Sequence, residues 1–167
     1  MLKPLFSFML MAVASAGYAQ TIVDSSATRS PVKTLNLKLY DALLKGEDVY
    51  DMALAGELNH YPSPGKILDY KKELDLSPQQ VTKLTTINTE LIRKKKEMGS
   101  FIIKNERVID SLFRTKKAND GNIIFFTNRY GIYHGELRNA ILQACVKVQS
   151  LLTPKQISKF ERLLNGK

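Results

Sequence analysis

The sequence predicts an all-α protein built around a long antiparallel helical hairpin, with short helices flanking it and an elongated shape. Two observations predict the hairpin. Residues 78–115 contain no proline after Pro78 and only one glycine, and their apolar residues recur at spacings of three, four and seven. A second run, over about 122–152, repeats the helical spacing after the loop KKANDGN. Strand signals are nearly absent, since IIFF at 123–126 is the only β-like run and fits a helix or a loop better.

The start of the chain has the pattern of an export signal followed by a leader. Lys3 gives a cationic start, LFSFMLMAVASA is an apolar run, and small residues of the kind that a signal peptidase recognises end at Ala19. We therefore expect residues 1–19 to be a signal peptide that is cleaved after Ala19. The apolar run is shorter than the roughly 20 residues of a membrane-spanning helix, so the mature protein is expected to have no membrane span. Residues 20–33 are polar and aperiodic, which indicates a flexible leader, and residues 34–167 are expected to form a single helical domain.

Three short helices are expected before the hairpin. Apolar residues recur at roughly helical spacing over 35–44 and again over 47–58. The segment NHYPSPGK then breaks the chain. Ser63 and Pro64 suit the N-cap and the first position of a third helix, which is expected to reach about Leu74.

A hydroxyl residue, a proline, any residue and a glutamine occur in this order twice, each time before an amphipathic run. In SPQQ, the Ser77 hydroxyl can accept the backbone N–H of Gln80, whose side chain can reach back to the Ser77 N–H. Proline at the first helical position loses no hydrogen bond. TPKQ repeats the pattern with Thr153 and Gln156, which predicts a second capping box and a last helix over 154–164. Capping boxes are common, so the interpretation that these are only caps stays open.

The first long run predicts a helix longer than a compact domain is wide. At about 1.5 Å per residue, 78–115 would extend ~57 Å, whereas a compact domain of this size is about 38 Å across. Because a two-helix layer of this length leaves an apolar face uncovered, we expect stability to depend on a second subunit. The expected apolar stripes comprise Leu84, Leu91, Met98, Ile102, Ile109 and Leu112 on the first long helix, and Tyr130, Tyr133, Leu137, Ile141, Cys145, Val148 and Leu152 on the second.

Taken together, these residues resemble the Spy/CpxP family of periplasmic proteins, which carry paired LTxxQ motifs. The two copies are LSPQQ at 76–80 and LTPKQ at 152–156, and the preceding segments YPSPGKILDYKKELD and GELRNAILQACVKVQSL are also similar. The resemblance covers roughly residues 58–164. It implies an all-α LTxxQ-type domain, a homodimer shaped like a shallow cradle and no catalysis. It also implies ATP-independent chaperone activity or regulation of an envelope stress pathway.

The balance of charge favours acidic partners. The chain has 25 Lys and Arg against 16 Asp and Glu, a net charge of +9, and loss of Lys3 with the signal peptide leaves 24 against 16, or +8. A basic exported protein is expected to meet acidic proteins or envelope surfaces rather than nucleic acid. For a chaperone, such a surface attracts an unfolded client at long range and then holds it by weak apolar contact.

The predicted client-binding surface lies on the first long helix, where a run of four cations precedes several apolar residues. Four adjacent cations span more than a helical turn, so some of them lie on the same side as the apolar stripe. The alternative is a solvated charged face beside a stripe that is only core. The candidate residues are Arg93, Lys94, Lys95, Lys96, Phe101, Ile102, Lys104, Val108, Ile109 and Leu112.

The sequence gives little support to metal binding or catalysis. His60 and His134, the only histidines, lie in different segments and have no His or Cys four residues away. Some relatives carry His where this chain has Ile141 and Cys145, so no metal site and no cofactor are predicted. Cys145 is expected to be a core residue, with an intersubunit disulfide as the alternative. No nucleophile–base pair or glycine-rich phosphate loop is recognisable, so no enzyme is predicted, and Gly99 is treated as plain helix interior.

We therefore predict an exported, periplasmic homodimer that binds unfolded or aggregation-prone envelope proteins without nucleotide. The competing hypothesis is a regulatory protein that docks onto the exported domain of an envelope sensor and is released under stress. A third hypothesis, metal buffering, predicts a zinc- or copper-dependent shift in melting temperature.

Overall fold

The computed structural model describes residues 30–165, and within this range the chain forms helices and no strand. The elements are α1 (Leu37–Lys45), α2 (Leu54–Glu57), α3 (Pro64–Asp69), α4 (Pro78–Arg114), α5 (Asp120–Leu151) and α6 (Pro154–Asn165). The all-α class and the long helix pair predicted from the sequence are confirmed. The predicted signal peptide and residues 20–29 of the leader lie outside the described residues, whereas Val32, at the end of the predicted leader, is buried in the core.

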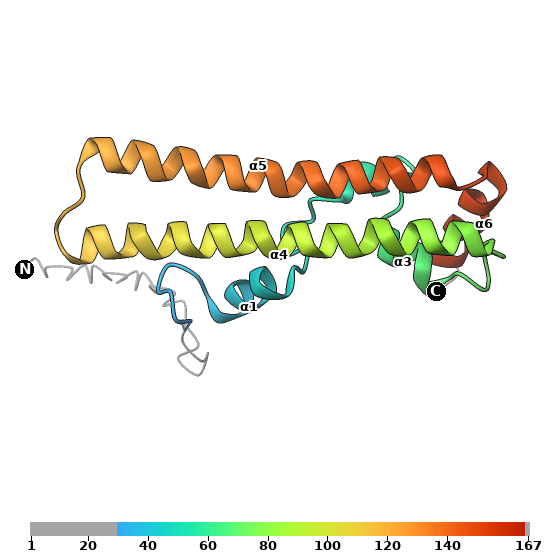
Figure 1. Ribbon diagram of the computed structural model, residues 1–167, viewed down its shortest axis with the longest axis horizontal. Helices are drawn as coiled ribbons and strands as arrows, with labels where there is room; N and C mark the ends of the chain where they lie inside the picture. Colours follow the sequence, from blue (N-terminus) through green and yellow to red (C-terminus); the bar gives the residue numbers. More distant parts are fainter. Residues whose placement is uncertain (1–29, 166–167) are drawn as a thin grey trace, which may run out of the picture.

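α4 and α5 lie side by side in opposite directions and give the molecule its elongated shape (Figure 1). α1 packs against the middle of α4, and α3 and α6 gather at the end away from the hairpin turn (Figure 1). α4 has 37 residues and α5 has 32, so the longer of the two extends about 55 Å.

The hairpin turn is short because both of its ends are defined by local contacts. α4 ends at Arg114, and Lys116 has the left-handed φ of 56° that reverses the chain. Asn119 caps α5, since its side chain accepts the Asn122 N–H at 3.0 Å while the Asn122 side chain accepts the Asn119 N–H at 3.0 Å. α5 therefore starts two residues before the predicted Asn122, which is the third helical residue of this capping box rather than the first.

The predicted helix over 47–58 is wrong over its first half, because only Leu54–Glu57 is helical. The Asp48 carboxylate accepts the backbone N–H groups of Met52 at 3.2 Å and Ala53 at 3.3 Å, which replaces the helical pattern by a loop closed on a side chain. Asp51 has a left-handed φ of 49° in this loop. Met52 and Ala53 are nevertheless buried, so the apolar pattern was a signal of burial rather than of helix. α3 is likewise shorter than predicted and ends at Asp69.

Buried side chains form two clusters along the hairpin. The first comprises Val32, Leu35, Leu43, Met52, Ala53, Leu91, Met98, Ile102, Ile103, Leu137, Ile141, Ala144 and Cys145. The second, at the end where α3 and α6 gather, comprises Ile67, Leu74, Leu84, Val148, Leu152 and Phe160. Between Asn105 on α4 and Leu137 on α5, that is, around the hairpin turn, the chain has no fully buried side chain. Among the elements formed by residues 30–165, no third one covers the turn end of the hairpin, which is a two-helix layer.

Gly99 is the residue at which α1 crosses α4. A Cβ atom at this position would lie 2.2 Å from the Leu43 carbonyl oxygen and 2.8 Å from its carbonyl carbon. Because both atoms belong to the backbone, no change of rotamer could relieve the overlap. The glycine thus lets α1 approach at backbone contact distance and bury Leu43, a role that its assignment to plain helix interior missed.

Substitution of Gly99 by alanine should separate α1 from α4. Although alanine favours helix by about 1 kcal/mol, the overlap with Leu43 should outweigh this gain and lower the free energy of unfolding by about 1–3 kcal/mol in urea titrations. The matched control is Gly121→Ala in the first turn of α5, where the new Cβ would be in ordinary contact, 3.5 Å from Asn119 Oδ1. The control should leave the free energy of unfolding unchanged or raise it by up to about 1 kcal/mol. A Gly99→Ala variant as stable as the control would contradict this packing of α1.

Candidate functional site

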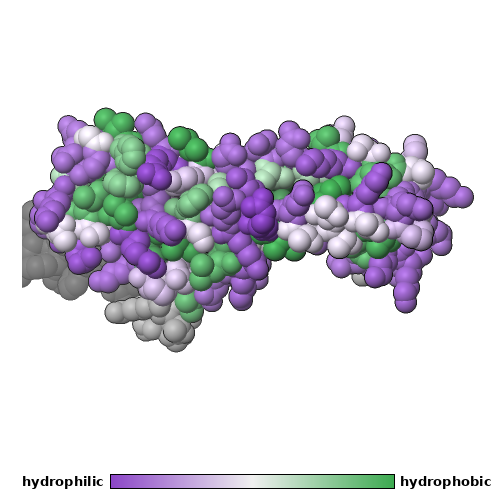
Figure 2. Space-filling view, in the orientation of Figure 1, coloured by the Kyte–Doolittle hydropathy of each residue, from purple (hydrophilic) through white to green (hydrophobic). Residues whose placement is uncertain are grey.

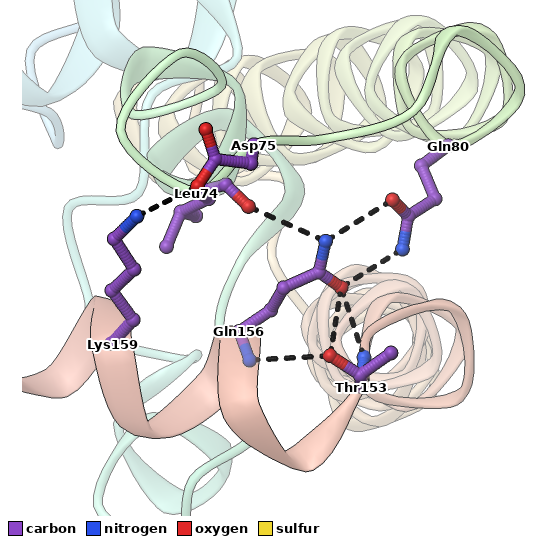
Figure 3. Close-up of polar contacts among 6 residues, drawn as sticks. All are labelled: Leu74, Asp75, Gln80, Thr153, Gln156 and Lys159. Atoms are coloured by element: carbon purple, nitrogen blue, oxygen red, sulfur yellow. Dashed lines mark hydrogen bonds and ion pairs between the residues drawn. The ribbon is translucent and has the colours of Figure 1, made fainter.

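The two capping motifs meet at one end of the hairpin (Figure 3). Gln80 donates from Nε2 to Gln156 Oε1 at 2.9 Å, and Gln156 donates from Nε2 to Gln80 Oε1 at 3.2 Å. Each oxygen also accepts the N-cap N–H of its own helix, that of Ser77 at 2.9 Å and that of Thr153 at 3.0 Å. The hydroxyls of Ser77 and Thr153 accept the N–H groups of Gln80 and Gln156. Both predicted capping boxes are confirmed, and the structure joins them into one unit that we call the glutamine clamp.

The clamp also uses the remaining amide donors. Gln80 Nε2 donates to the carbonyl of Leu151, the last residue of α5, at 2.9 Å, and Gln156 Nε2 donates to the carbonyl of Leu74 at 3.4 Å. The Leu151 carbonyl is one of those that a helix end leaves without an intrahelical partner. Glutamate could accept the N-cap N–H as well as glutamine does, but only the amide carries donors. The clamp therefore explains why both motifs end in glutamine.

An ion pair and an aromatic contact support the clamp from outside. Lys159 of α6 lies 2.9 Å from Asp75, and its hydrogen bond lowers the pKa of this exposed carboxyl below its ordinary value (Figure 3). The rings of Tyr70 and Phe160 meet edge to face at 5.7 Å. All polar atoms of the two clamp amides are thus used within the protein, which favours a structural role for the motifs.

A groove of about 200 Å³ lies between α4 and α5 on the turn side of the first core cluster. The Phe101 ring stacks on the Tyr133 ring at 5.2 Å across the two helices. The residues that line this aromatic groove are Phe101, Lys104, Asn105, Val108, Phe126, Arg129 and Tyr133.

The aromatic groove is positively charged. Lys104 Nζ lies 5.8 Å from the centre of the Phe101 ring, and the Arg129 guanidinium lies 5.5 Å from that of Tyr133. Arg129 also donates from Nε to the Tyr133 hydroxyl at 2.9 Å, which holds the guanidinium beside the groove. No acidic side chain lines the groove, and none of the described carboxylates forms an ion pair with Lys104 or Arg129. Such a surface suits an apolar or an anionic partner.

Asn105 is the buried polar residue of the groove. Its side chain donates from Nδ2 to the Phe126 carbonyl at 3.0 Å and so ties α4 to α5. Its Oδ1 atom is buried and has no hydrogen-bond partner. An unpaired buried acceptor costs about 1–3 kcal/mol, so an N–H donor that reached this atom would recover part of the cost.

The structure divides the predicted client-binding residues. Phe101, Lys104 and Val108 line the aromatic groove, whereas Ile109 and Leu112 are half-buried nearer the turn. Ile102 has no exposed surface and belongs to the first core cluster, so it takes no part in a client-binding surface in this conformation.

The run of four cations is not a single patch. Arg93 and Lys94 each lie 3.6 Å from Glu97 and line a separate groove of about 240 Å³ between α4 and α5. Lys95 is half-buried, and its burial lowers the pKa of its ammonium group below the ordinary value. Lys96 remains exposed. The charge expected to act together on a client is therefore spread over different faces of α4.

Sequence analysis missed the half of the groove that α5 contributes. Phe126, Arg129 and Tyr133 lie at spacings of three and four, which places them on one side of the helix. This aromatic–cation–aromatic spacing was the available signal. It was overlooked because Tyr133 was assigned to the apolar stripe, and because the first turns of the helix predicted over 122–152 were not considered as a binding surface.

The two histidines and the cysteine lie in separate surroundings. The His134 ring lies 5.0 Å from the Tyr50 ring and 4.2 Å from the Tyr130 ring, and burial lowers the pKa of the imidazole. His60 pairs with Glu161. Cys145 has no exposed surface, so its expected core position is confirmed, and burial raises the pKa of its thiol. Among residues 30–165, no three His, Cys, Asp or Glu side chains gather in a way that could hold a metal ion.

Comparisons with known proteins gave no match, whether against family models, curated proteins or solved structures. Membership of the Spy/CpxP family therefore stays a prediction from the sequence motifs. In the described part of the chain, none of the helices combines the length and the apolar character needed to cross a bilayer.

Replacement of either clamp glutamine by glutamate should distinguish the contribution of the contact between the two motifs from that of helix capping. The carboxylate keeps the acceptor for the N-cap N–H but loses the two donors and faces the oxygen of the partner amide. We therefore expect Gln80→Glu and Gln156→Glu each to lower the free energy of unfolding by about 1–3 kcal/mol. If the motifs were only caps, an acidic residue in the first helical turn would be neutral or stabilising.

The matched control is Gln79→Glu, an exposed neighbour in the first turn of α4. It should change the free energy of unfolding by less than about 0.5 kcal/mol in the same urea titrations. Equal stability of all three glutamate variants would show that the contact between the two motifs does not contribute.

Proposed function

We propose that this chain is an exported, ATP-independent chaperone that binds unfolded or aggregation-prone envelope proteins. The observation that carries the proposal is the aromatic groove, with its stacked rings, two cations and no acidic side chain. Unfolded proteins expose apolar side chains that a native protein hides, and these can contact the rings. The cations attract acidic stretches of a client at long range, and shallow contact allows release without nucleotide. The proposal requires no catalysis, metal or cofactor.

The visible face of the molecule carries both hydrophobic and hydrophilic side chains, as weak and sliding contact with a client requires (Figure 2). Figure 2 shows hydrophobic patches interrupted by hydrophilic side chains along the visible face of the molecule. The net charge of +8 that remains after loss of Lys3 with the signal peptide adds a long-range attraction to acidic clients. The sequence pattern of an export signal supports a site of action outside the cytoplasm.

Neutralising the groove should weaken protection of a client. In low salt, Lys104→Gln/Arg129→Gln should require about fivefold or more protein than the unmodified chain to suppress aggregation of a chemically denatured client, followed by light scattering. The matched control is Lys71→Gln/Lys72→Gln, which removes the same charge from exposed positions at the other end of the molecule. Melting curves of both variants check that the fold is kept.

The outcomes separate the competing functions. Equal loss in both variants would mean that overall charge, and not the groove, holds the client. A protein that fails to suppress aggregation but binds tightly to a single envelope receptor would support the regulatory alternative.

We also propose that the protein is a homodimer and that the side of α5 facing away from α4 forms the interface. Along the middle of α5, this outer side carries Ile132 and Val146, both more than half exposed. Gly131 and Gly135 lie close to Ile132 in the sequence, and a Cβ atom at either glycine would have no neighbour within 4 Å. Apolar residues on both sides are typical of a buried helix. A twofold axis would pack the outer side of α5 against the same side of α5 in a second subunit. A dimer of two rods agrees with the cradle that the family resemblance implies.

A charge in the middle of this outer side should dissociate the dimer. Ile132→Asp should convert the mass measured by light scattering after gel filtration from that of a dimer to that of a monomer, because an unpaired buried carboxylate is costly. Leu58→Asp, a change at a position that is 70% exposed beside α2, should leave the dimer intact. A monomeric unmodified protein at micromolar concentration would refute the proposed dimer.

A further inference from the structure

Three large apolar side chains surround the hairpin turn. Phe113, the residue before the last of α4, is 56% exposed, and Ile124 and Phe125, in the second turn of α5, are 61% and 52% exposed. The turn forms one end of the rod and lies away from α3 and α6 (Figure 1). No residue from 106 to 136 is fully buried, so these side chains are not the edge of a core. Their exposure points to a contact with a partner molecule.

The same end of the rod is basic. From 107 to 128, without the groove residue Arg129, the chain has four basic residues, Arg107, Arg114, Lys116 and Lys117, against two acidic residues, Asp110 and Asp120. The Asp110 carboxylate lies 3.7 Å from Arg114, and Asp120 lies in the first turn of α5, where the helix dipole favours a carboxylate. Lys116 and Lys117 are exposed in the turn itself, and no described carboxylate lies within ion-pair distance of them.

We propose that the hairpin turn docks onto the surface of an anionic lipid bilayer. Aromatic side chains are favoured at the level of lipid headgroups, and lysines beside them gain attraction from anionic lipids. Phe113 on α4 and Ile124 and Phe125 on α5 lie on either side of the turn, at one end of the elongated molecule. This position suits shallow insertion into the lipid–water interface. The aromatic groove and the glutamine clamp would stay in water. This inference does not rest on the proposed chaperone activity, because neither the three apolar side chains nor the two turn lysines line the aromatic groove.

An anionic protein is the other partner that a basic and apolar end could attract. The bilayer is favoured because the exposed side chains do not line the aromatic groove, which Val108 and Phe126 line instead. Exposed rings beside a turn can insert into a lipid interface, because lipids rearrange around them. A folded protein would instead have to present a pocket of matching shape.

The test is flotation of the mature protein with vesicles of phosphatidylglycerol and phosphatidylcholine, compared with vesicles of phosphatidylcholine alone. In low salt, the protein should float with the anionic vesicles and bind the neutral ones much less. Lys116→Gln/Lys117→Gln should weaken partitioning into anionic vesicles by about thirtyfold. Phe113→Ser/Phe125→Ser should weaken it by about tenfold or more.

Matched changes elsewhere separate the turn from the rest of the surface. Lys71→Gln/Lys72→Gln, Leu58→Ser and the single groove variant Lys104→Gln should each float within about twofold of the unmodified protein, since none of them lies at the turn. Melting curves show whether each variant folds.

Absence of flotation with anionic vesicles would overturn the proposal. Equal loss of flotation in the control variants and the turn variants would also overturn it. So would a protein that binds no vesicles but binds an acidic protein through the residues of the turn. Because the groove variant is among the controls, failure of vesicle docking and failure of the chaperone proposal are separately visible.

Discussion

The contact on which the rest of the structure depends is the pair of amides formed by Gln80 and Gln156. It joins the start of α4, the end of α5 and the start of α6, and it uses backbone groups that helix ends leave without partners. Beneath it lies a cluster of apolar side chains that belongs to the same three helices and to α3. The pair also determines how far α5 is shifted along α4, because a slip by one turn would separate both glutamines. The Phe101 ring, which lies 21 residues after Gln80 on α4, stacks on the Tyr133 ring only if that shift is correct.

Much of this architecture could be predicted from the sequence, because the responsible forces act locally. Proline after a hydroxyl residue and glutamine two positions later define a helix start with neighbouring atoms alone. The long uninterrupted apolar stripes defined the hairpin in the same way. Prediction failed where another local contact replaced the helical pattern. The Asp48 carboxylate accepts the N–H groups of Met52 and Ala53 and closes a loop over a segment with helical spacing, so its apolar residues are buried without being helical.

The site was predictable only in part. Phe101, Lys104 and Val108 carried the right chemistry, but a groove needs two walls, and the register of α5 against α4 depends on the clamp rather than on a local signal. Ile102 shows the reverse problem, because the sequence placed it both on the apolar stripe and among the client-binding residues, and only the folded structure shows that it is core. The crossing of α1 over α4 at Gly99 was also missed. A glycine within a helix could have suggested such a crossing. Its partner could not be identified before the chain was folded.

The absence of fully buried side chains around the hairpin turn gives the rod a gradient of local stability. Backbone hydrogen bonds near the clamp are protected by two clusters of apolar side chains, whereas those near the turn are protected by little more than the helices themselves. Amide hydrogens should therefore exchange slowly at one end and quickly at the other, as the turn opens and closes without disturbing the rest. The end near the clamp is therefore the more stable one, whereas the turn end can change its shape without unfolding of the domain.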